Sequence, residues 1–221
     1  MSTQFRDRRE AGRRLAHELL EYVDRPDLLV LALPRGGVPV AAEVARRLHA
    51  PLDVLVVRKL GLPGQKELAM GAIASGGVRV LNREVVEVAG VPDQVIDAVA
   101  AQEQAELERR ERIYRGDQPL PEVHAKTVLL VDDGIATGST MFAAIAALQK
   151  LGAGRIIVAT PTIARETFHE MREVADDVVA VMVPDDFHGV GQWYENFSQT
   201  SDDEVREILV RFAGPDRDIS G

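Results

Sequence analysis

The chain has 221 residues and is 46% hydrophobic, so it is long enough to bury the core of one α/β domain. It contains no cysteine, which excludes disulfides, thiolate catalysis and cysteine metal sites. Its formal net charge of −9, from 35 acidic and 26 basic residues, argues against general nucleic-acid binding, because such binding depends on neutralising phosphates.

The N-terminus has no apolar signal segment, and no apolar run in the chain is long enough to span a membrane. We therefore expect a cytoplasmic protein with neither a membrane nor a nucleic acid as its partner.

The first predicted element is an amphipathic helix over residues 7–22, which Pro26 ends. The segment is rich in arginine, with Arg6, Arg8, Arg9, Arg13 and Arg14. These side chains form either a local basic patch or, as we favour, the polar face of the helix.

A continuous apolar run predicts the first central strand over residues 28–33. It leads into a glycine turn, Pro34-Arg35-Gly36-Gly37, and then into a helix over residues 40–48. Backbone amides at a helix start, together with one guanidinium, favour an anion. The turn is therefore either an anion site or a plain tight turn.

A further strand is predicted over residues 52–57, with Arg58 and Lys59 at its end. Residues 60–68, which include Lys66, have the glycine and proline content of a mobile loop. These three cations suit either a negatively charged ligand or a solvated surface, and Arg58 and Lys59 are the better candidates because they end a strand.

Residues 70–74 and 78–81 predict a β-hairpin around a Ser-Gly-Gly turn. Residues 92–115 predict one long helix, supported by i,i+4 pairs of Glu106 with Arg110 and of Glu108 with Arg112. Much of this helix is polar, so it should pack along a narrow stripe. We expect it to have a structural role or to form a dimer contact, and we expect a homodimer.

The most informative stretch joins a buried strand, an acidic pair and a loop. Residues 128–131 are continuously apolar, which is typical of a strand buried on both faces of a parallel sheet. The acidic pair, Asp132 and Asp133, follows where open α/β sheets place their ligands. The next residues form what we call the phosphate loop, which leads into a helix: Gly134, Ile135, Ala136, Thr137, Gly138, Ser139 and Thr140.

The phosphate loop has the chemistry of an anion cradle, because a helix start offers free N–H groups and its hydroxyls can donate to phosphate oxygens. The acidic pair can accept hydrogen bonds from sugar hydroxyls or hold hydrated Mg²⁺, directly or through water. Ribose 5-phosphate, a phosphate next to a diol, would satisfy both parts. The loop is not a Walker A motif, since the residue directly after Gly138 is not a lysine. The chain contains no GxGxxG.

Two other interpretations of this stretch exist. It could be a buried strand followed by a capped helix and a solvated acidic pair. It could also belong to a response-regulator receiver domain, but there the acidic strand opens the domain, whereas 126 residues precede this strand.

Strands and helices continue to alternate after this stretch. The sequence predicts a strand over residues 155–160, a helix over residues 164–174 and a strand over residues 178–183. This order predicts an α/β fold with a doubly wound, mainly parallel sheet. We expect a single domain over residues 1–221, with a core at about 28–183.

Four aromatic residues gather in residues 184–197 of a chain that is only 5% aromatic. Phe187, Trp193 and Tyr194 could stack on a flat ligand or could cover the edge of the sheet. We call residues 184–200 the hood and expect it to form a small unit with the N-terminal helix. A helix over residues 202–212 should close the fold, and residues 214–221 should form a disordered tail.

The segment Val-Asp-Asp-Gly-Ile-Ala-Thr-Gly-Ser-Thr, at residues 131–140, resembles the 5-phosphoribosyl-1-pyrophosphate (PRPP) motif of type I phosphoribosyltransferases. The acidic pair, the Thr-Gly and the closing Thr fall in register. The resemblance implies Mg²⁺-dependent transfer of the phosphoribosyl group to a nitrogen acceptor, such as a nucleobase in nucleotide salvage, with release of pyrophosphate. The alternative is a PRPP-binding regulatory protein without transferase activity.

The resemblance also implies roles for individual residues. The phosphate loop would bind the 5-phosphate, and a flexible β-hairpin loop would close over PRPP and exclude water. The acidic pair would bind the ribose and the metal. Pyrophosphate would lie on Arg35, Gly36, Gly37 and Lys66, and the acceptor on Phe187, Trp193 and Tyr194. The residues expected to carry the chemistry are Arg35, Arg58, Lys59, Asp132 and Asp133.

The identity of the acceptor is left open by the sequence. The hood is similar to the Pro-Asp-x-Phe pattern of 6-oxopurine enzymes, with changed spacing. However, Ala136 stands where those enzymes have an acidic residue, and no lysine follows Lys150. The Ala-Thr-Gly of the loop is closer to adenine and uracil enzymes, and a non-nucleobase acceptor is a further alternative. Arg35, Arg58 and Lys59 would serve pyrophosphate departure, which favours an enzyme over a regulator.

Overall fold

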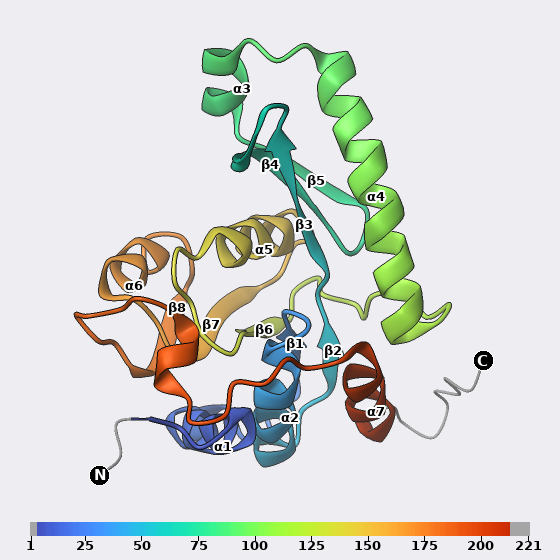
Figure 1. Cartoon of the computed structure of the whole chain (residues 1–221). Coiled ribbons are helices and arrows are strands. Elements are labelled where there is room, and N and C mark those ends of the chain that lie inside the picture. The colour runs from blue at the N-terminus through green and yellow to red at the C-terminus, as the bar shows by residue number, and fades with distance from the viewer. Residues whose placement is uncertain (1–3, 213–221) are drawn as a thin grey trace.

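A computed structural model describes residues 4–212, apart from the side chains of residues 66 and 67. The tail predicted at residues 214–221 lies outside the described residues. The central element is a five-stranded parallel sheet with the strand order β2-β1-β6-β7-β8 (Figure 1). Its strands are β1 (Leu28–Ala32), β2 (Leu52–Val54), β6 (Thr127–Val131), β7 (Arg155–Thr162) and β8 (Asp177–Met182). The predicted mainly parallel sheet is confirmed.

Helices cover both faces of this sheet, because alternate strand residues point to opposite sides. Leu28, Val30 and Ala32 of β1 belong to one core, and Leu29 and Leu31 belong to the other. The first core is covered by α1 (Arg8–Glu18), α2 (Gly37–Leu48) and α7 (Asp202–Phe212). The second core is covered by α5 (Ser139–Lys150) and α6 (Arg165–Met171). The sheet is therefore doubly wound, as expected.

The first helix is shorter than predicted. Asp7 caps it by accepting a hydrogen bond from the backbone N–H of Glu10 at 2.8 Å, so the helix begins at Arg8. It ends at Glu18, and a short 3₁₀ turn, η1 (Leu20–Tyr22), follows.

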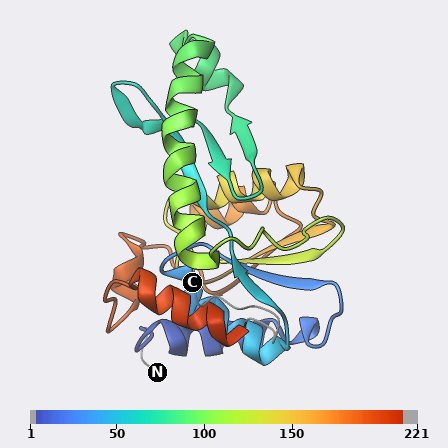
Figure 2. The same cartoon turned by 90° about the vertical axis from the view of Figure 1, so that its right-hand side faces the viewer.

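A second, antiparallel sheet rises from the first and consists of β3 (Val57–Leu62), β4 (Gln65–Ala74) and β5 (Val78–Leu81) (Figure 1, Figure 2). The hairpin predicted at 70–74 and 78–81 is confirmed. It continues into α3 (Arg83–Ala89), an element the sequence analysis did not predict, and α4 (Asp93–Arg115).

The structure corrects two predictions in this region. The strand expected over residues 52–57 ends at Val54, so Arg58 and Lys59 lie within β3 and not at the end of a strand of the central sheet. The loop expected over residues 60–68 is mostly strand, because β3 pairs with β4 almost to its tip. Register shifts on both sides of Gly61 accommodate the residues whose composition suggested a loop.

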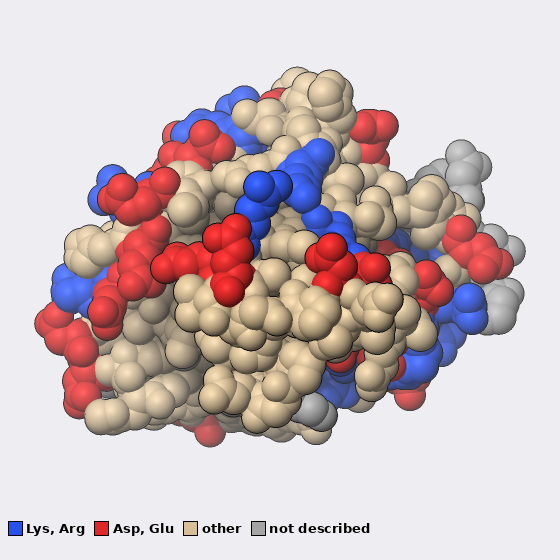
Figure 3. Space-filling view, turned by 90° about the horizontal axis from the view of Figure 1, so that it is seen from above, with Lys and Arg blue, Asp and Glu red and all other residues tan. Residues whose placement is uncertain are grey.

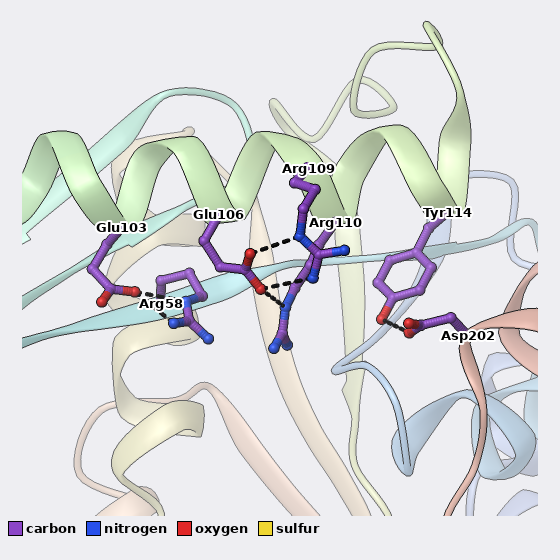
Figure 4. A network of polar contacts seen from close by, with 7 residues as sticks. All are labelled: Arg58, Glu103, Glu106, Arg109, Arg110, Tyr114 and Asp202. Atoms are coloured by element: carbon purple, nitrogen blue, oxygen red, sulfur yellow. Dashed lines mark hydrogen bonds and ion pairs between the residues drawn. The ribbon is translucent and has the colours of Figure 1, made fainter.

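Helix α4 packs along a narrow apolar stripe, as predicted, and carries ion pairs on its polar surface (Figure 4). Glu106 accepts from Arg109 at 2.7 Å and from Arg110 at 2.9 Å, and these hydrogen bonds lower the pKa of Glu106 to about 2. Glu108 instead accepts from Gln104 at 2.9 Å, in place of the predicted contact with Arg112.

The surface of the molecule carries both signs of charge. On the face seen in Figure 3, Lys and Arg side chains lie among Asp and Glu side chains. Within residues 4–212, none of the helices combines the length and the apolar character that crossing a bilayer requires.

Candidate functional site

Two loops predicted as anion sites meet at the carboxyl edge of the central sheet. Strands β1 and β6 are parallel neighbours, and the N–H of Leu33 after β1 donates to the carbonyl of Val131 at 2.9 Å. A Cβ added to Gly36 would lie 2.1 Å from Asp133 Oδ2, and one on Gly37 would lie 3.0 Å from Asp132 Cα. The backbone of Gly36 is ordinary, with φ −60° and ψ −33°, so glycine is needed there for close approach.

The phosphate loop borders a pocket of about 210 Å³. Helix α5 begins at the loop, after Gly138 in the left-handed conformation with φ 70°. Gly138 has no side chain to cap the helix, so the amides of the first turn are available to an anion. Ser139 and Thr140 are exposed there. The pocket lining is Lys59, Asp132, Gly134, Ile135, Ala136, Thr137, Gly138, Ser139, Thr140, Met141 and Val190.

Hydrogen bonds hold the phosphate loop from behind. The N–H of Ile135 donates to the carbonyl of Thr162 at 2.9 Å, and the N–H of Ala164 donates to the carbonyl of Ile135 at 3.0 Å. The hydroxyl of Thr167 on α6 donates to the carbonyl of Ala136 at 2.5 Å. These bonds fix the loop backbone without using the hydroxyls of Thr137 and Ser139, which lie 3.1 Å apart.

The two carboxylates of the acidic pair have different surroundings. Asp132 lines the pocket, and its Oδ1 accepts from the N–H of Asp133 at 2.8 Å. Burial raises the pKa of the Asp132 carboxyl well above its usual range, and the charge of Asp133 adds to this effect. Asp133 is 9% exposed, and its Oδ2 accepts from Arg8 Nε at 2.7 Å.

The donor set of the site suits Mg²⁺ bound together with a phosphate. Within residues 4–212, no group of three or more His, Asp or Glu side chains could hold a metal alone. The protein would therefore supply only the one or two carboxylates of the acidic pair. Mg²⁺ in phosphate sites is bound in this way, because the substrate and water provide its other ligands.

The structure separates the predicted cations. Lys59 borders the pocket, whereas its neighbour on β3, Arg58, forms an ion pair with Glu103 of α4 at 2.7 Å (Figure 4). Successive residues of a strand point to opposite faces, which explains the separation. The guanidinium of Arg58 is thus held by α4 and does not line the pocket. The side chain of Lys66 lies outside the described part of the chain.

Arg35 lies in the glycine turn, which leads into α2. The next residue, Gly36, packs against Asp133, so the turn holds the backbone of Arg35 beside the acidic pair. The positive charge of Arg35 opposes the rise in the pKa of Tyr114 that burial and a hydrogen bond to Asp202 at 2.7 Å cause.

Of the two roles expected for the hood aromatic residues, Tyr194 takes the second, covering the edge of the sheet, because it belongs to an apolar cluster that packs against Val181 and Met182 of the edge strand β8. Tyr194 is buried between Phe5 and Phe197, with ring centroids 5.4 and 5.0 Å away. Its hydroxyl donates to the carbonyl of Asp133 at 2.5 Å, and burial raises its pKa. The predicted stacking role of Tyr194 does not fit this position, because neighbouring aromatic rings pack against its ring. Phe187 and Trp193 are half-buried, with centroids 6.1 Å apart.

Two residues of this site were missed by the sequence analysis. Val190 of the hood lines the pocket, and a Cβ on Gly134 would lie 2.3 Å from its Cγ1. Arg8 was assigned to the polar face of the first helix, yet it binds Asp133. Neither residue carries a local signal, because the partner of Arg8 is 125 residues away in the chain.

Comparisons with known proteins agree with the fold and the site. A family model described as "Phosphoribosyl transferase domain" matches residues 63–197. Two curated proteins, from the CDC 1551 / Oshkosh and ATCC 25618 / H37Rv strains of Mycobacterium tuberculosis, are each 48% identical over 208 residues. The second is named "Putative phosphoribosyl transferase Rv0571c". Each match covers 94% of this chain and 46% of the relative, so the chain spans about half the length of these curated relatives.

A solved structure is similar along its whole length. The crystal structure of the protein TT1426 from Thermus thermophilus matches with 41% identity and a TM-score of 0.86, covering 96% of this chain and 100% of that one. The family match spans more than half of the chain and includes the acidic pair, the phosphate loop and most of the hood. The chain therefore belongs to the phosphoribosyl transferase family.

Proposed function

We propose that the chain is a Mg²⁺-dependent phosphoribosyltransferase, which moves the 5-phosphoribosyl group of PRPP to a nitrogen acceptor and releases pyrophosphate. The observation that carries this proposal is the close packing of the glycine turn against the acidic pair, beside the phosphate loop. PRPP has a phosphate, a diol and a pyrophosphate in the same order as these three parts of the site.

Each part of the site would have one task. The phosphate loop would bind the 5-phosphate through amides and hydroxyls. Asp132, which faces the pocket, would accept hydrogen bonds from the ribose hydroxyls. The glycine turn, with Arg35, and Lys59 at the pocket edge would receive the pyrophosphate. The acidic pair would hold Mg²⁺, directly or through water, and the bound ion would neutralise charge on the phosphate oxygens.

Catalysis would come from positioning and from stabilisation of the leaving group. The acceptor nitrogen attacks the anomeric carbon while the bond from that carbon to the pyrophosphate oxygen breaks, with inversion. Lys59 of the second sheet lines the pocket. The second sheet can therefore help to exclude water from the reacting carbon. No protein nucleophile is needed.

The proposal extends to the acceptor, the cellular location and the oligomeric state. We propose a nucleobase acceptor, within nucleotide salvage, and the half-buried pair Phe187 and Trp193 is the support for a flat ligand. The cysteine-free composition supports a cytoplasmic location. The exposed length of α4 supports a homodimer contact.

Release of pyrophosphate from PRPP and Mg²⁺, measured with a panel of nucleobases, tests the reaction. We expect release with at least one base. Arg35→Ala should slow that release by about 100-fold, because it removes a charge that stabilises the leaving group. The same variant should keep its affinity for ribose 5-phosphate, which has no pyrophosphate.

Two outcomes would contradict this account. Equal losses of transfer and of ribose 5-phosphate binding would remove Arg35 from the pyrophosphate role. PRPP binding without pyrophosphate release for any acceptor would favour a PRPP-binding regulatory protein.

A further inference from the structure

Arg8 joins three parts of the molecule at the acidic pair. Its Nε donates to Asp133 Oδ2 at 2.7 Å, and the two side chains are only 11% and 12% exposed. Its Nη1 donates to the carbonyl of Ser198 in the hood at 2.6 Å. Its guanidinium carbon lies 4.0 Å from the ring centroid of Phe197, within the range of a cation–π interaction. One side chain of α1 therefore binds both the hood and the site.

Further contacts hold the N-terminal segment and the hood together and against Asp133. The Tyr194 hydroxyl donates to the Asp133 carbonyl at 2.5 Å. The N–H of Phe5 donates to the carbonyl of Trp193, and the N–H of Glu195 donates to the carbonyl of Phe5, both at 2.8 Å. The N-terminal segment and the hood thus form one unit, which meets the central sheet at Asp133.

The contact with Arg8 makes the two acids unequal. Asp132 lines the pocket, whereas an oxygen of Asp133 is committed to Arg8 and lies against the backbone of Gly36. A nearly buried carboxylate that loses its partner is strongly disfavoured, so Asp133 depends on Arg8 for its position.

We propose that Arg8 is a positioning residue of the phosphoribosyl site. It fixes Asp133 and thereby fastens the hood and the N-terminal helix to the acidic pair, and it leaves Asp132 as the carboxylate that faces the ligand. The ligand part of this inference rests on the proposed function.

The affinity for PRPP and Mg²⁺, measured by calorimetry, should show a characteristic pattern in variants of these residues. Arg8→Met and Asp133→Asn should each weaken binding by about ten-fold. The double variant should be no weaker than either single variant, because both remove the same contact. Asp132→Asn should weaken binding more than either, because it alters the ligand-facing carboxylate.

Two further variants separate the role of Arg8 from a simple loss of charge. Arg8→Lys keeps the charge but has a single donor group in place of the guanidinium fork, so it should recover only part of the affinity. Arg9→Met removes a charge from the same helix at an exposed position and should bind as the wild type does. Wild-type affinity in Arg8→Met, or losses that multiply in the double variant, would overturn the proposal.

A readout without ligand separates this inference from the proposed function. Trp193 is the one tryptophan of the chain, and its indole nitrogen is buried in the hood. In Arg8→Met its fluorescence emission should move to longer wavelength with unchanged far-UV circular dichroism, and in Arg9→Met it should not move. If the wild type bound no PRPP, the proposed function would fail, and this red shift would still support the fastening of the hood. An unchanged emission would overturn the fastening even if PRPP bound.

Discussion

Gly36→Ala should slow the release of pyrophosphate from PRPP by about 100-fold, since a shift of an ångström in the reacting geometry can cost this much in rate. The new Cβ would lie 2.1 Å from Asp133 Oδ2 and 2.6 Å from its Cγ, where no atom can fit. Either the glycine turn or the carboxylate must move, and both belong to the proposed ligand site. Overpacking of this kind also costs about 1–3 kcal/mol of stability. Assays of pyrophosphate release and urea unfolding measure the two effects.

Gly189→Ala is the matched control for this substitution. A Cβ at Gly189 would meet nothing within 4 Å, and its φ of 172° is extended backbone that any residue adopts. This variant should release pyrophosphate and unfold as the wild type does. Equal behaviour of the two alanine variants would show that the contact between the glycine turn and the acidic pair is not required.

Arg115→Met should lower the free energy of unfolding by about 3–5 kcal/mol, the usual cost of breaking a buried ion pair. Arg115 is 5% exposed at the end of α4. Its Nη1 donates to the Val54 carbonyl at 3.0 Å, and its Nη2 donates to the Ser75 hydroxyl at 3.2 Å. It also lies 3.6 Å from the buried Asp53. The side chain therefore joins α4 to both sheets, and urea unfolding followed by circular dichroism measures its contribution.

Arg112→Met removes the same charge from an exposed position of the same helix. Surface substitutions usually change stability by less than about 0.5 kcal/mol, and we expect this one to do the same. If the two methionine variants unfolded at the same urea concentration, the bonds of Arg115 would not contribute to holding the sheets together.

The central sheet was predictable because its strands are buried on both faces. Strands β1 and β6 therefore appear in the sequence as continuous apolar runs, and the order of strands and helices gives the parallel topology. The second sheet was less predictable. Gly61, Pro63 and Gly64 have the composition of a loop, and only pairing with β4 makes the first of them part of a strand. Pairing partners are a tertiary property that local composition does not contain.

In the candidate site, too, features that are contiguous in the sequence were predictable and contacts between distant residues were not. The acidic pair and the phosphate loop are contiguous, so the sequence alone indicated their chemistry. The contacts of Asp133 with Arg8 and of Tyr194 with Phe5 join residues more than a hundred positions apart. The sequence therefore left two roles open for Tyr194, stacking on a ligand or covering the edge of the sheet, and could not show that Phe5 packs against it.

Calorimetric titration of the chain with PRPP, in the presence and absence of Mg²⁺, shows whether the phosphate loop and the acidic pair form a phosphoribosyl site. We expect tight binding that depends on Mg²⁺ and is lost in the double variant Asp132→Asn, Asp133→Asn. Absence of PRPP binding by the wild type, or wild-type affinity in the double variant, would contradict the assignment of the phosphate loop and the acidic pair as a phosphoribosyl site.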